Sequence, residues 1–366
     1  MTKKDNFYFF IGTTAELIKL FPVIREFESR KIDFKIITSG QTKINFNEVG
    51  SWIKKTKPDI VLPGKVNESS IFVFLIWAFR TLLNSISLHK EFKSLNREHT
   101  YLIVHGDTVS SLIGAMISKF YRTKLVHIES GLRSFNFLEP FPEEISRFII
   151  SHIADIHFCP NQWSMDNLKN IGGIKINTMQ NTLIESFNMA INKNAYGYRK
   201  LVGRGKYFVF VLHRQEHVIF RKQESKELVE FVFRHAPENI KCVFITHVTT
   251  RDFLSQLSDK TLVQIGDKLV FQPRLPYVEF MHLLNNAEFL ITDGGSNQEE
   301  SYYMGLPCLI VRSCTERIEG LGKNAVLAKY DKRLIKIFLE NYRKYRGKQV
   351  KAERPSKIIV DNLTRN

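Results

Sequence analysis

The segment Thr292–Glu300, TDGGSNQEE, joins an expected strand to an expected helix. The apolar run Ala287–Ile291 before it indicates a buried strand, and Ser301–Met304 after it indicates a helix that ends at Gly305. Glycines at such a junction let a phosphate approach the backbone N–H groups of the positive helix end. Many such turns bind nothing, but two adjacent carboxylates that could meet a ribose diol favour a nucleotide-sugar site. The expected phosphate and ribose contacts are Gly294, Gly295, Ser296 and Glu300.

Composition bounds the class of protein. With 366 residues, 43% of them apolar and 25% charged, the chain is long enough for two globular domains. Its four cysteines show no CxxC spacing, so we expect core thiols in a cytoplasmic protein and neither zinc nor disulfides. The net charge of +16 is spread along the chain without a nucleic-acid-binding signature. We interpret it as a solvated basic surface and expect no nucleic-acid partner.

The run Ile71–Phe79 is apolar throughout, and Arg80 then begins an amphipathic continuation. Nine residues are too few to span a bilayer. The favoured interpretation is a buried domain helix. The alternative is peripheral contact of an aromatic helix face with an anionic membrane, which would place the protein on the inner face.

Alternating strand and helix patterns fill most of the chain. In the first part, expected strands include Phe7–Ile11, Tyr101–Val104 and Lys124–Ile128, and a further helix is expected at Ile44–Trp52. A second series begins at Tyr207–Leu212. The pattern predicts an α/β fold of two Rossmann-like domains with parallel sheets facing a central cleft. No G-x-G-x-x-G follows the first strand, so a redox cofactor such as NAD is not expected.

The expected domains are residues 1–178, which carry the acid–base side of the cleft, and 179–337, which bind the nucleotide. A C-terminal helix at about 338–366 is expected to pack back on the first domain. The polar sequence between Asn161 and Gly205 is interpreted as the passage between the halves.

Carboxyl groups recur where strands of the first half end. Asp107, Glu129 and Glu143 would gather at one site, where like charges and burial favour general acid and base roles. Arg133 and Arg147 could hold a carboxylate or face a diphosphate. Each residue alone also has a structural interpretation: Asp107 could cap a helix, and Glu143 and Arg147 have the spacing of a helical surface pair. Their recurrence at successive strand ends favours a site, and His213 at the end of Tyr207–Leu212 would face it.

With these residues in place, the chain resembles the non-hydrolysing UDP-N-acetylglucosamine 2-epimerases, which share the two-domain GT-B fold of many glycosyltransferases. The resemblance spans most of the chain. It is carried by motifs in the same order: Gly12-Thr13, Glu16, Ile18-Lys19, Ser39-Gly40-Gln41, His105–Thr108, His127–Arg133, Pro142–Glu144, Arg147, Asn181-Thr182, His213-Arg214, Glu216, Asp293, Gln298–Glu300 and Thr315–Arg317.

The resemblance implies an enzyme that eliminates UDP from a UDP-HexNAc and adds it back with C2 inverted, for cell-surface polysaccharide precursors. It implies that Asp107, Glu129 and Glu143 are the acid–base set, with His213 at the diphosphate and Lys19 in the active site. Neither metal nor NAD is implied, and the family's usual homodimer is expected. Substrate contacts are expected at Thr13, Gln41, Arg133, Arg147, Gly294, Gly295, Ser296, Glu300 and Arg317.

Some residues depart from the family pattern. Thr14 and Ala15 replace the Arg-Pro of the first loop, which removes a cation, and Thr42 replaces the family's common histidine. The alternative function is therefore a GT-B glycosyltransferase with a membrane-associated or polysaccharide acceptor, favoured by the lost arginine, the basic charge and the run Ile71–Phe79. A silent nucleotide-sugar sensor is a third interpretation without a positive feature. The three retained carboxyls favour the epimerase.

Overall fold

A computed structural model describes residues 5–63, 71–93, 95–203, 205–212, 222–246 and 266–365. The chain divides into two compact units. Unit 1 comprises Met1–Ser186 and Ala352–Asn366, and unit 2 comprises Phe187–Lys351. Residues 338–351 belong to unit 2, so the part of the C-terminal region that lies in unit 1 is shorter than the sequence suggested.

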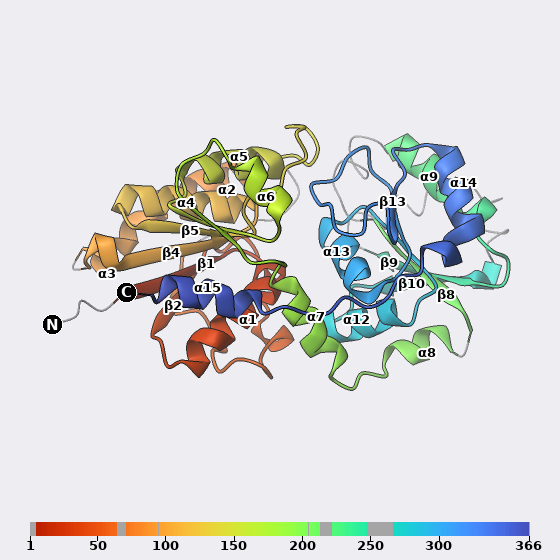
Figure 1. Ribbon diagram of the computed structural model, residues 1–366, viewed down its shortest axis with the longest axis horizontal. Helices are drawn as coiled ribbons and strands as arrows, with labels where there is room; N and C mark the ends of the chain where they lie inside the picture. The colour runs from red at the N-terminus through yellow and green to blue at the C-terminus, as the bar shows by residue number, and fades with distance from the viewer. Residues whose placement is uncertain are drawn as a thin grey trace. The chain divides into compact units, whose positions relative to one another are not determined.

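Unit 1 is built on a seven-stranded parallel sheet in the order β3-β2-β1-β4-β5-β6-β7. Figure 1 shows its strands β2, β1, β4 and β5 side by side in that order. Its strands are β1 (Asn6–Ile11), β2 (Phe34–Thr38), β3 (Ile60–Val61), β4 (Thr100–His105), β5 (Lys124–Ile128), β6 (Ile156–Cys159) and β7 (Ile174–Asn177). Its helices are α1 (Thr14–Ser29), α2 (Ile71–Asn84), α3 (His89–Phe92), α4 (Val109–Tyr121), α5 (Glu143–Ile153), α6 (Gln162–Asn167), the start of α7 (Leu183–Ile191) and α15 (Pro355–Leu363). Short 3-10 turns are η1 (Phe46–Glu48), η2 (Ser85–Leu88) and η3 (Arg97–His99).

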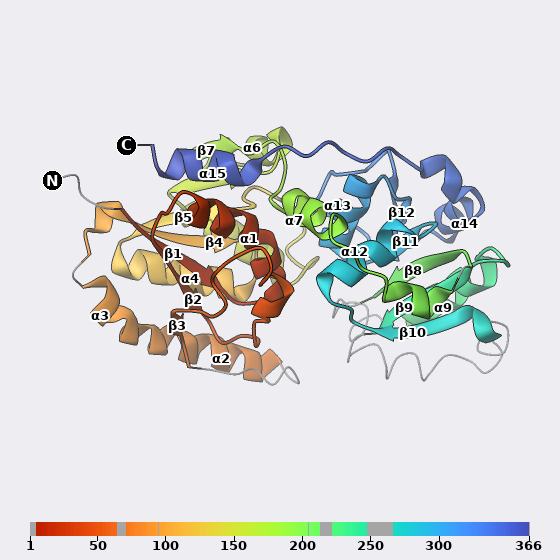
Figure 2. The same cartoon turned by 90° about the horizontal axis from the view of Figure 1, so that it is seen from below.

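Helices cover both faces of this sheet. On one face α15 lies beside α1 in both views, although the two helices come from opposite ends of the chain (Figures 1 and 2). On the other face α4 packs between α2 and α5. Burial on both faces explains why β1, NFYFFI, is almost entirely apolar. The predicted arrangement, a parallel sheet with helices on both faces, is thus confirmed for unit 1.

Local sequence explains where α1 begins. Thr13 caps the helix: its side chain accepts from the Glu16 N–H, and the Glu16 carboxylate accepts in return from the Thr13 N–H. This capping box satisfies two N–H groups of the first turn. Leu17 and Leu20 then bury one face of the helix against the sheet. Lys19 is thereby placed in the second turn of α1.

Unit 2 contains a six-stranded parallel sheet in the order β10-β9-β8-β11-β12-β13. Its strands are β8 (Tyr207–Val211), β9 (Lys241–Thr246), β10 (Leu269–Pro273), β11 (Leu290–Thr292), β12 (Cys308–Ile310) and β13 (Ala325–Leu327). Its helices are the rest of α7, α8 (Tyr198–Val202), α9 (Lys222–His235), α12 (Tyr277–Asn285), α13 (Gly295–Met304) and α14 (Lys332–Asn341), with turns η5 (Gly266–Lys268) and η6 (Tyr342–Tyr345). A core of large aromatic residues, including Phe208, Phe289 and Phe338, fills the space between the sheet, α9 and α14.

One expectation about local structure was wrong. The segment Ile44–Trp52 forms only the turn η1, because Asn45 caps that turn from its side chain and Gly50 follows it closely. The chain passes from unit 1 to unit 2 within Asn161–Gly205, as expected, but the segment is more structured than its polar sequence suggested: it carries α6 and β7, an edge strand of the first sheet, before the chain enters unit 2 within α7. Short, partly exposed β7 has too little apolar character to be recognised from sequence.

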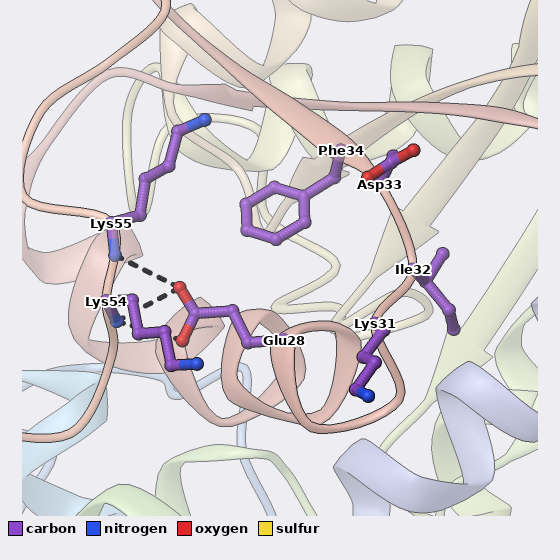
Figure 3. Close-up of a pocket in the computed structure, with 7 residues that line it drawn as sticks. All are labelled: Glu28, Lys31, Ile32, Asp33, Phe34, Lys54 and Lys55. Carbon is purple, nitrogen blue, oxygen red and sulfur yellow. Dashed lines mark hydrogen bonds between the residues drawn. The ribbon is translucent and has the colours of Figure 1, made fainter.

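A surface cavity of about 380 Å³ lies in unit 1 (Figure 3). Its lining residues are Glu28, Lys31, Ile32, Asp33, Phe34, Lys54 and Lys55. The Glu28 carboxylate accepts from the backbone N–H groups of Lys54 and Lys55 at 2.9 to 3.0 Å. Phe34 is the first residue of β2, so the cavity is at the amino end of the sheet. It is therefore separate from the strand ends at which ligands bind in such folds.

Candidate functional site

Three polar segments of unit 1 follow neighbouring strands. Gly12–Glu16 follows β1, Gly106-Asp107 follows β4, and Glu129–Arg133 follows β5, and these three strands are adjacent and parallel. Their carboxyl ends share one edge of the sheet, which confirms the expected gathering of these segments. Close approach of the first two segments requires Gly12, because a Cβ there would overlap the Ser110 side chain at the start of α4.

Glu129 is at the centre of the first cluster. Its side chain is buried, and Lys19 Nζ lies 3.0 Å from its Oε2. The Asn181 amide donates to the same oxygen, and His105 Nε2 lies 4.0 Å away. Glu129 has φ +65°, in the left-handed region that non-glycine residues rarely adopt. Partners from three parts of unit 1 therefore surround one carboxylate, in a backbone conformation that directs it to this place.

Asp107 belongs to a second cluster, formed with α5. The Arg147 guanidinium contacts the Asp107 carboxylate through Nη2, and its Nη1 donates to Glu144 Oε2 at 3.0 Å. Arg133 Nε donates to the other Glu144 oxygen at 2.5 Å. Arg147 is buried and pairs with Glu144 three residues earlier, so the alternative interpretation of Arg147 as a helical surface residue does not apply. Glu143 itself is half-buried as the first residue of α5.

Arg133 also lies close to two aromatic rings. Its guanidinium carbon lies 5.3 Å from the Phe135 ring centroid and 5.5 Å from that of Phe148. Such stacking suits the planar, weakly hydrated guanidinium. Together with the bond to Glu144, these contacts fix the Arg133 side chain against its own unit.

The loop after β1 is an internally bonded polar layer. Buried Glu16 accepts from the Gly12 N–H at 2.5 Å, from Ser111 Oγ at 3.2 Å and from Thr108. Burial raises the pKa of Glu16, although these donors oppose the shift. Gln41 Oε1 accepts from Ser110 Oγ at 2.5 Å. Thr13 and Gln41 thus lie in the same layer as the strand ends, with Thr13 also occupied as the cap of α1.

Two buried histidines pair across β5 and β6 behind this edge. His127 Nε2 donates to the Gly106 carbonyl at 2.8 Å, because a carbonyl can only accept. His157 Nε2 likewise donates to the Gly172 carbonyl, so its Nδ1 accepts from Ser130 Oγ at 2.9 Å. Burial lowers the pKa of His127 to about 3 and that of His157 to about 4. Both rings are therefore neutral and structural near pH 7.

The glycine segment of unit 2 lies where the sequence placed it, between β11 and α13. Gly294 caps the helix with an extended backbone, and its N–H donates to Thr292 Oγ1 at 2.9 Å. Helix α13 begins at Gly295 and ends at Met304, with Gly305 in the left-handed conformation. A Cβ at Gly295 would lie 2.4 Å from Glu316 Oε1, so a larger residue would displace that side chain. The helix starts earlier than expected, and its N–H groups at Gly295 and Ser296 form the helix end suited to an anion.

The two carboxylates of this segment have different surroundings. Glu299 is fully buried, accepts from Tyr303 Oη at 2.5 Å, and pairs with Arg317 Nη1 at 2.5 Å. Glu300 accepts from Asn297 Nδ2 at 3.0 Å and lies against Tyr277. Burial, with the nearby carboxylates adding to it, raises the pKa of the Tyr277 phenol well above its usual value.

Gln298 ties α13 to the segment that carries Arg317. Its amide donates to the carbonyls of Arg317 and Glu319 and accepts from Thr315 Oγ1 at 2.7 Å. Arg317 is therefore fixed at both its backbone and its guanidinium group. Its observed partners are groups of unit 2, which gives it an evident structural role.

The structure also shows residues whose roles the sequence did not assign. Asn181 belongs to the Asn181-Thr182 motif but was not among the expected site residues, and nothing in the spacing linked it to Glu129, 52 residues earlier. Glu144 was overlooked because its neighbour Glu143 matched the family pattern equally well. His213 lies outside the described residues. Asn181 and Glu144 could be found only from the contacts of the folded chain.

Within the described ranges, no group of three or more His, Cys, Asp or Glu side chains could hold a metal ion. The described helices include none that is long and apolar enough to cross a membrane. Cys159, Cys242 and Cys308 are buried free thiols, and Cys314 is half-buried. Burial raises the pKa of Cys159 and of Cys308 to about 12.

Comparisons with known proteins give matches to the family that the sequence resembles. A sequence profile described as UDP-N-acetylglucosamine 2-epimerase matches residues 85–356. The UDP-N-acetylglucosamine 2-epimerase of Methanocaldococcus jannaschii is 29% identical over 373 residues, which cover 96% of this chain and 97% of the relative. A crystal structure of the M. jannaschii UDP-GlcNAc 2-epimerase in complex with UDP-GlcNAc and UDP aligns with a TM-score of 0.78 at 25% identity, covering 98% of this chain and 99% of that one. The S. aureus MnaA–UDP co-structure aligns with a TM-score of 0.82 at 21% identity, covering 98% and 96%, and shows likeness of fold.

Proposed function

Because the chain belongs to the UDP-N-acetylglucosamine 2-epimerase family, we propose that it inverts C2 of a UDP-HexNAc, with UDP-N-acetylglucosamine as the substrate. A base removes the C2 proton, the C1–O bond breaks, and UDP leaves with the bonding electrons. The 2-acetamidoglucal then takes UDP back at C1 while an acid delivers a proton to the other face of C2. The product is the C2 epimer, in a pathway to cell-surface polysaccharide. The observation that carries the proposal is the pair of carboxylate clusters around Glu129 and Asp107 at the ends of adjacent strands.

We assign the proton transfers to Asp107, Glu129 and Glu143, with Lys19 stabilising Glu129. Reaction on both faces of C2 needs at least two acid–base groups, and general acid–base catalysis by a positioned group contributes about 10² to 10⁴ in rate. The separate partners of Asp107 and Glu129, Arg147 and Lys19 respectively, support separate roles. His213 is proposed to assist at the diphosphate.

We further propose that unit 2 binds UDP. The α13 N-terminus at Gly294–Ser296 would take the phosphates, and Glu300 would accept from the ribose hydroxyls. Thr13 and Gln41 keep their proposed substrate contacts from unit 1. The buried ion pairs of Arg133, Arg147 and Arg317 support positioning roles for these three arginines in place of the expected ligand contacts.

The GT-B fold is shared with glycosyltransferases, and the aligned epimerases do not favour a transferase. Purified protein incubated with UDP-N-acetylglucosamine alone separates the two functions. The proposal predicts new proton NMR signals of the C2 epimer growing to a constant ratio with no acceptor present. An unchanged sugar that is transferred only when a lipid or polysaccharide acceptor is added would contradict it.

No metal or redox cofactor takes part in the proposed chemistry, since elimination and addition transfer only protons and UDP. Dialysis against EDTA, with no NAD added, should leave the rate of epimer formation unchanged. A rate that falls and returns only with added metal would contradict this part of the proposal.

Two partners are proposed. The first is a homodimer, to be measured by light scattering.

The second is peripheral contact of this proposed cytoplasmic protein with an anionic membrane. It is supported by an exposed stripe on α2 and η2 consisting of Ile76, Phe79, Leu83 and Ile86. Helix α2 carries Arg80 and no carboxylate, which suits an anionic surface. The side chains of Ile71–Leu75 lie outside the described part of the chain.

A further inference from the structure

Glu144 is the most fully enclosed carboxylate at the carboxyl edge of the unit 1 sheet, with no exposed surface. Each of its oxygens receives a guanidinium: Oε1 accepts from Arg133 at 2.5 Å and Oε2 from Arg147 at 3.0 Å. Oε2 also accepts from the Ser134 N–H at 3.0 Å. Burial alone would raise the pKa of Glu144, but the Ser134 N–H and the two arginines together hold it below its usual value. The group is therefore ionised at neutral pH.

The four side chains form one continuous row of alternating charge: Arg133, Glu144, Arg147 and Asp107. They come from the segments after β5 and β4 and from the first turns of α5. Two positive and two negative groups balance one another, which is the condition for keeping charges at a buried place. Glu144 is the member that connects the rest, because it alone contacts both arginines.

Arg147 couples the position of Glu144 to that of Asp107. A guanidinium is planar and rigid, so its Nη1 and Nη2 cannot move independently. With Nη1 on Glu144 and Nη2 on Asp107, the position of one carboxylate sets the position available to the other. Arg147 is also buried, and solvent cannot readily replace a lost partner.

We propose that Glu144 is a positioning residue that acts through Arg147 to hold the Asp107 carboxylate in its reactive orientation. The inference rests on the proposed function, because it takes Asp107 as an acid–base group. It assigns the two neighbouring glutamates different roles: Glu143 is proposed to transfer protons, whereas Glu144 touches neither substrate nor reacting atoms. Loss of the Glu144 charge should release Arg147 and leave Asp107 misplaced without changing the groups that bind UDP.

The test measures deuterium exchange at C2 of UDP-N-acetylglucosamine in deuterium oxide, with kcat and KM separated. Glu144→Gln keeps the size of the side chain and removes its charge. We expect kcat to fall at least tenfold while KM stays within twofold. Glu91→Gln is the matched control, since Glu91 also joins two partners, Lys35 and Tyr8, but at the amino end of the sheet. Its kcat should stay within twofold of wild type.

Arg147→Lys tests the same row if Glu144→Gln does not fold. A single ammonium cannot span both carboxylates, so kcat should again fall at least tenfold with KM unchanged. A raised KM with normal kcat would instead make Arg147 a substrate contact and overturn the inference.

A double variant tests whether the loss of activity in Glu144→Gln arises through Asp107. If Glu144 acts on Asp107, the combination of Glu144→Gln with Asp107→Asn should exchange no more slowly than Asp107→Asn alone. Full multiplication of the two losses would overturn the inference. A wild-type protein without C2 exchange would overturn the proposed function and this inference with it, whereas active wild type with an unaffected Glu144→Gln variant overturns the inference alone.

Discussion

The Lys19 ammonium lies 3.0 Å from Glu129 Oε2, although the two residues are 110 positions apart in the sequence. Lys19 projects from α1 and Glu129 follows β5, so the pair joins two segments of unit 1 at the edge that carries the acid–base candidates. The Asn181 amide contacts the same carboxylate oxygen. Lys19 therefore contacts a proposed acid–base group directly and is not only a basic residue near the site.

Replacement of Lys19 by Met should therefore cost both stability and activity. It leaves the buried Glu129 carboxylate without its cation, and breaking a buried pair in this way costs about 3 kcal/mol of unfolding free energy. Urea unfolding at pH 7 measures the loss. Lys35→Met is the control, because the Lys35–Glu91 pair is largely exposed and should change the value by less than about 1 kcal/mol. Equal effects of the two substitutions would contradict the account of Glu129.

Substitutions at the two adjacent glutamates of α13 should separate ligand binding from folding. Glu300→Ala removes the proposed ribose acceptor and should weaken UDP binding about tenfold, which corresponds to about 1.4 kcal/mol. Glu299→Gln breaks the buried contact with Arg317 and should mainly lower the melting temperature. Isothermal titration with UDP and thermal unfolding of both variants check the assignment. Unchanged UDP affinity in Glu300→Ala would remove Glu300 from the site.

Acid should destabilise unit 1 through its buried histidines. The pKa of His157 is about 4 when folded, against an ordinary value near 6.5, so the unfolded chain binds the extra proton between these pH values. Stability is full above pH 6.5 and falls as the pH drops toward 4. For one such histidine the loss between pH 7 and pH 5 is about 2 kcal/mol.

His157→Gln should remove about 2 kcal/mol from that pH-dependent loss. A glutamine amide can donate to Gly172 and accept from Ser130, as the ring does, without taking up a proton. Urea unfolding at pH 7 and pH 5 gives the comparison, with the exposed His152→Gln as control. A variant with the same pH dependence as wild type would show that His157 is not responsible.

Much of this fold could be predicted from the sequence, and the reasons are local. Runs such as Phe7–Ile11 have no polar alternative to a buried parallel strand, and Gly305 marks the end of α13 correctly. The failures occurred where local signals are weak. Short β7 has no strongly apolar pattern, and Ile44–Trp52 has helical spacing but residues that favour turns.

The sequence indicated which residues lie at the candidate site better than it indicated which of them contact one another. Strand-end reasoning gathered Asp107 and Glu129 at one edge, because the carboxyl ends of adjacent parallel strands must meet. It could not indicate which carboxylate each arginine would hold. The contact of Arg147 with Glu144 depends on where α5 begins and on side-chain directions that spacing alone does not specify.

The exposed stripe on α2 and η2 predicts measurable association. Phe79 has 63% of its surface exposed and Leu83 51%, so serine at both positions should not disturb the core. The double variant is expected to bind vesicles of anionic lipid more weakly than wild type, and wild-type binding should fall with added salt. Light scattering runs in parallel. If the double variant binds vesicles normally but changes from dimer to monomer, the stripe is a dimer surface and the membrane proposal is wrong.

Deuterium incorporation at C2 tests the central claim most directly. Wild-type protein incubated with UDP-N-acetylglucosamine in deuterium oxide should yield both C2 epimers carrying deuterium at C2, because the proton removed before UDP leaves is exchanged with solvent. Asp107→Asn should slow this incorporation at least about 100-fold while UDP affinity stays within severalfold. Wild-type protein that leaves the C2 proton in place, or an Asp107→Asn variant that exchanges at the normal rate, would contradict the account.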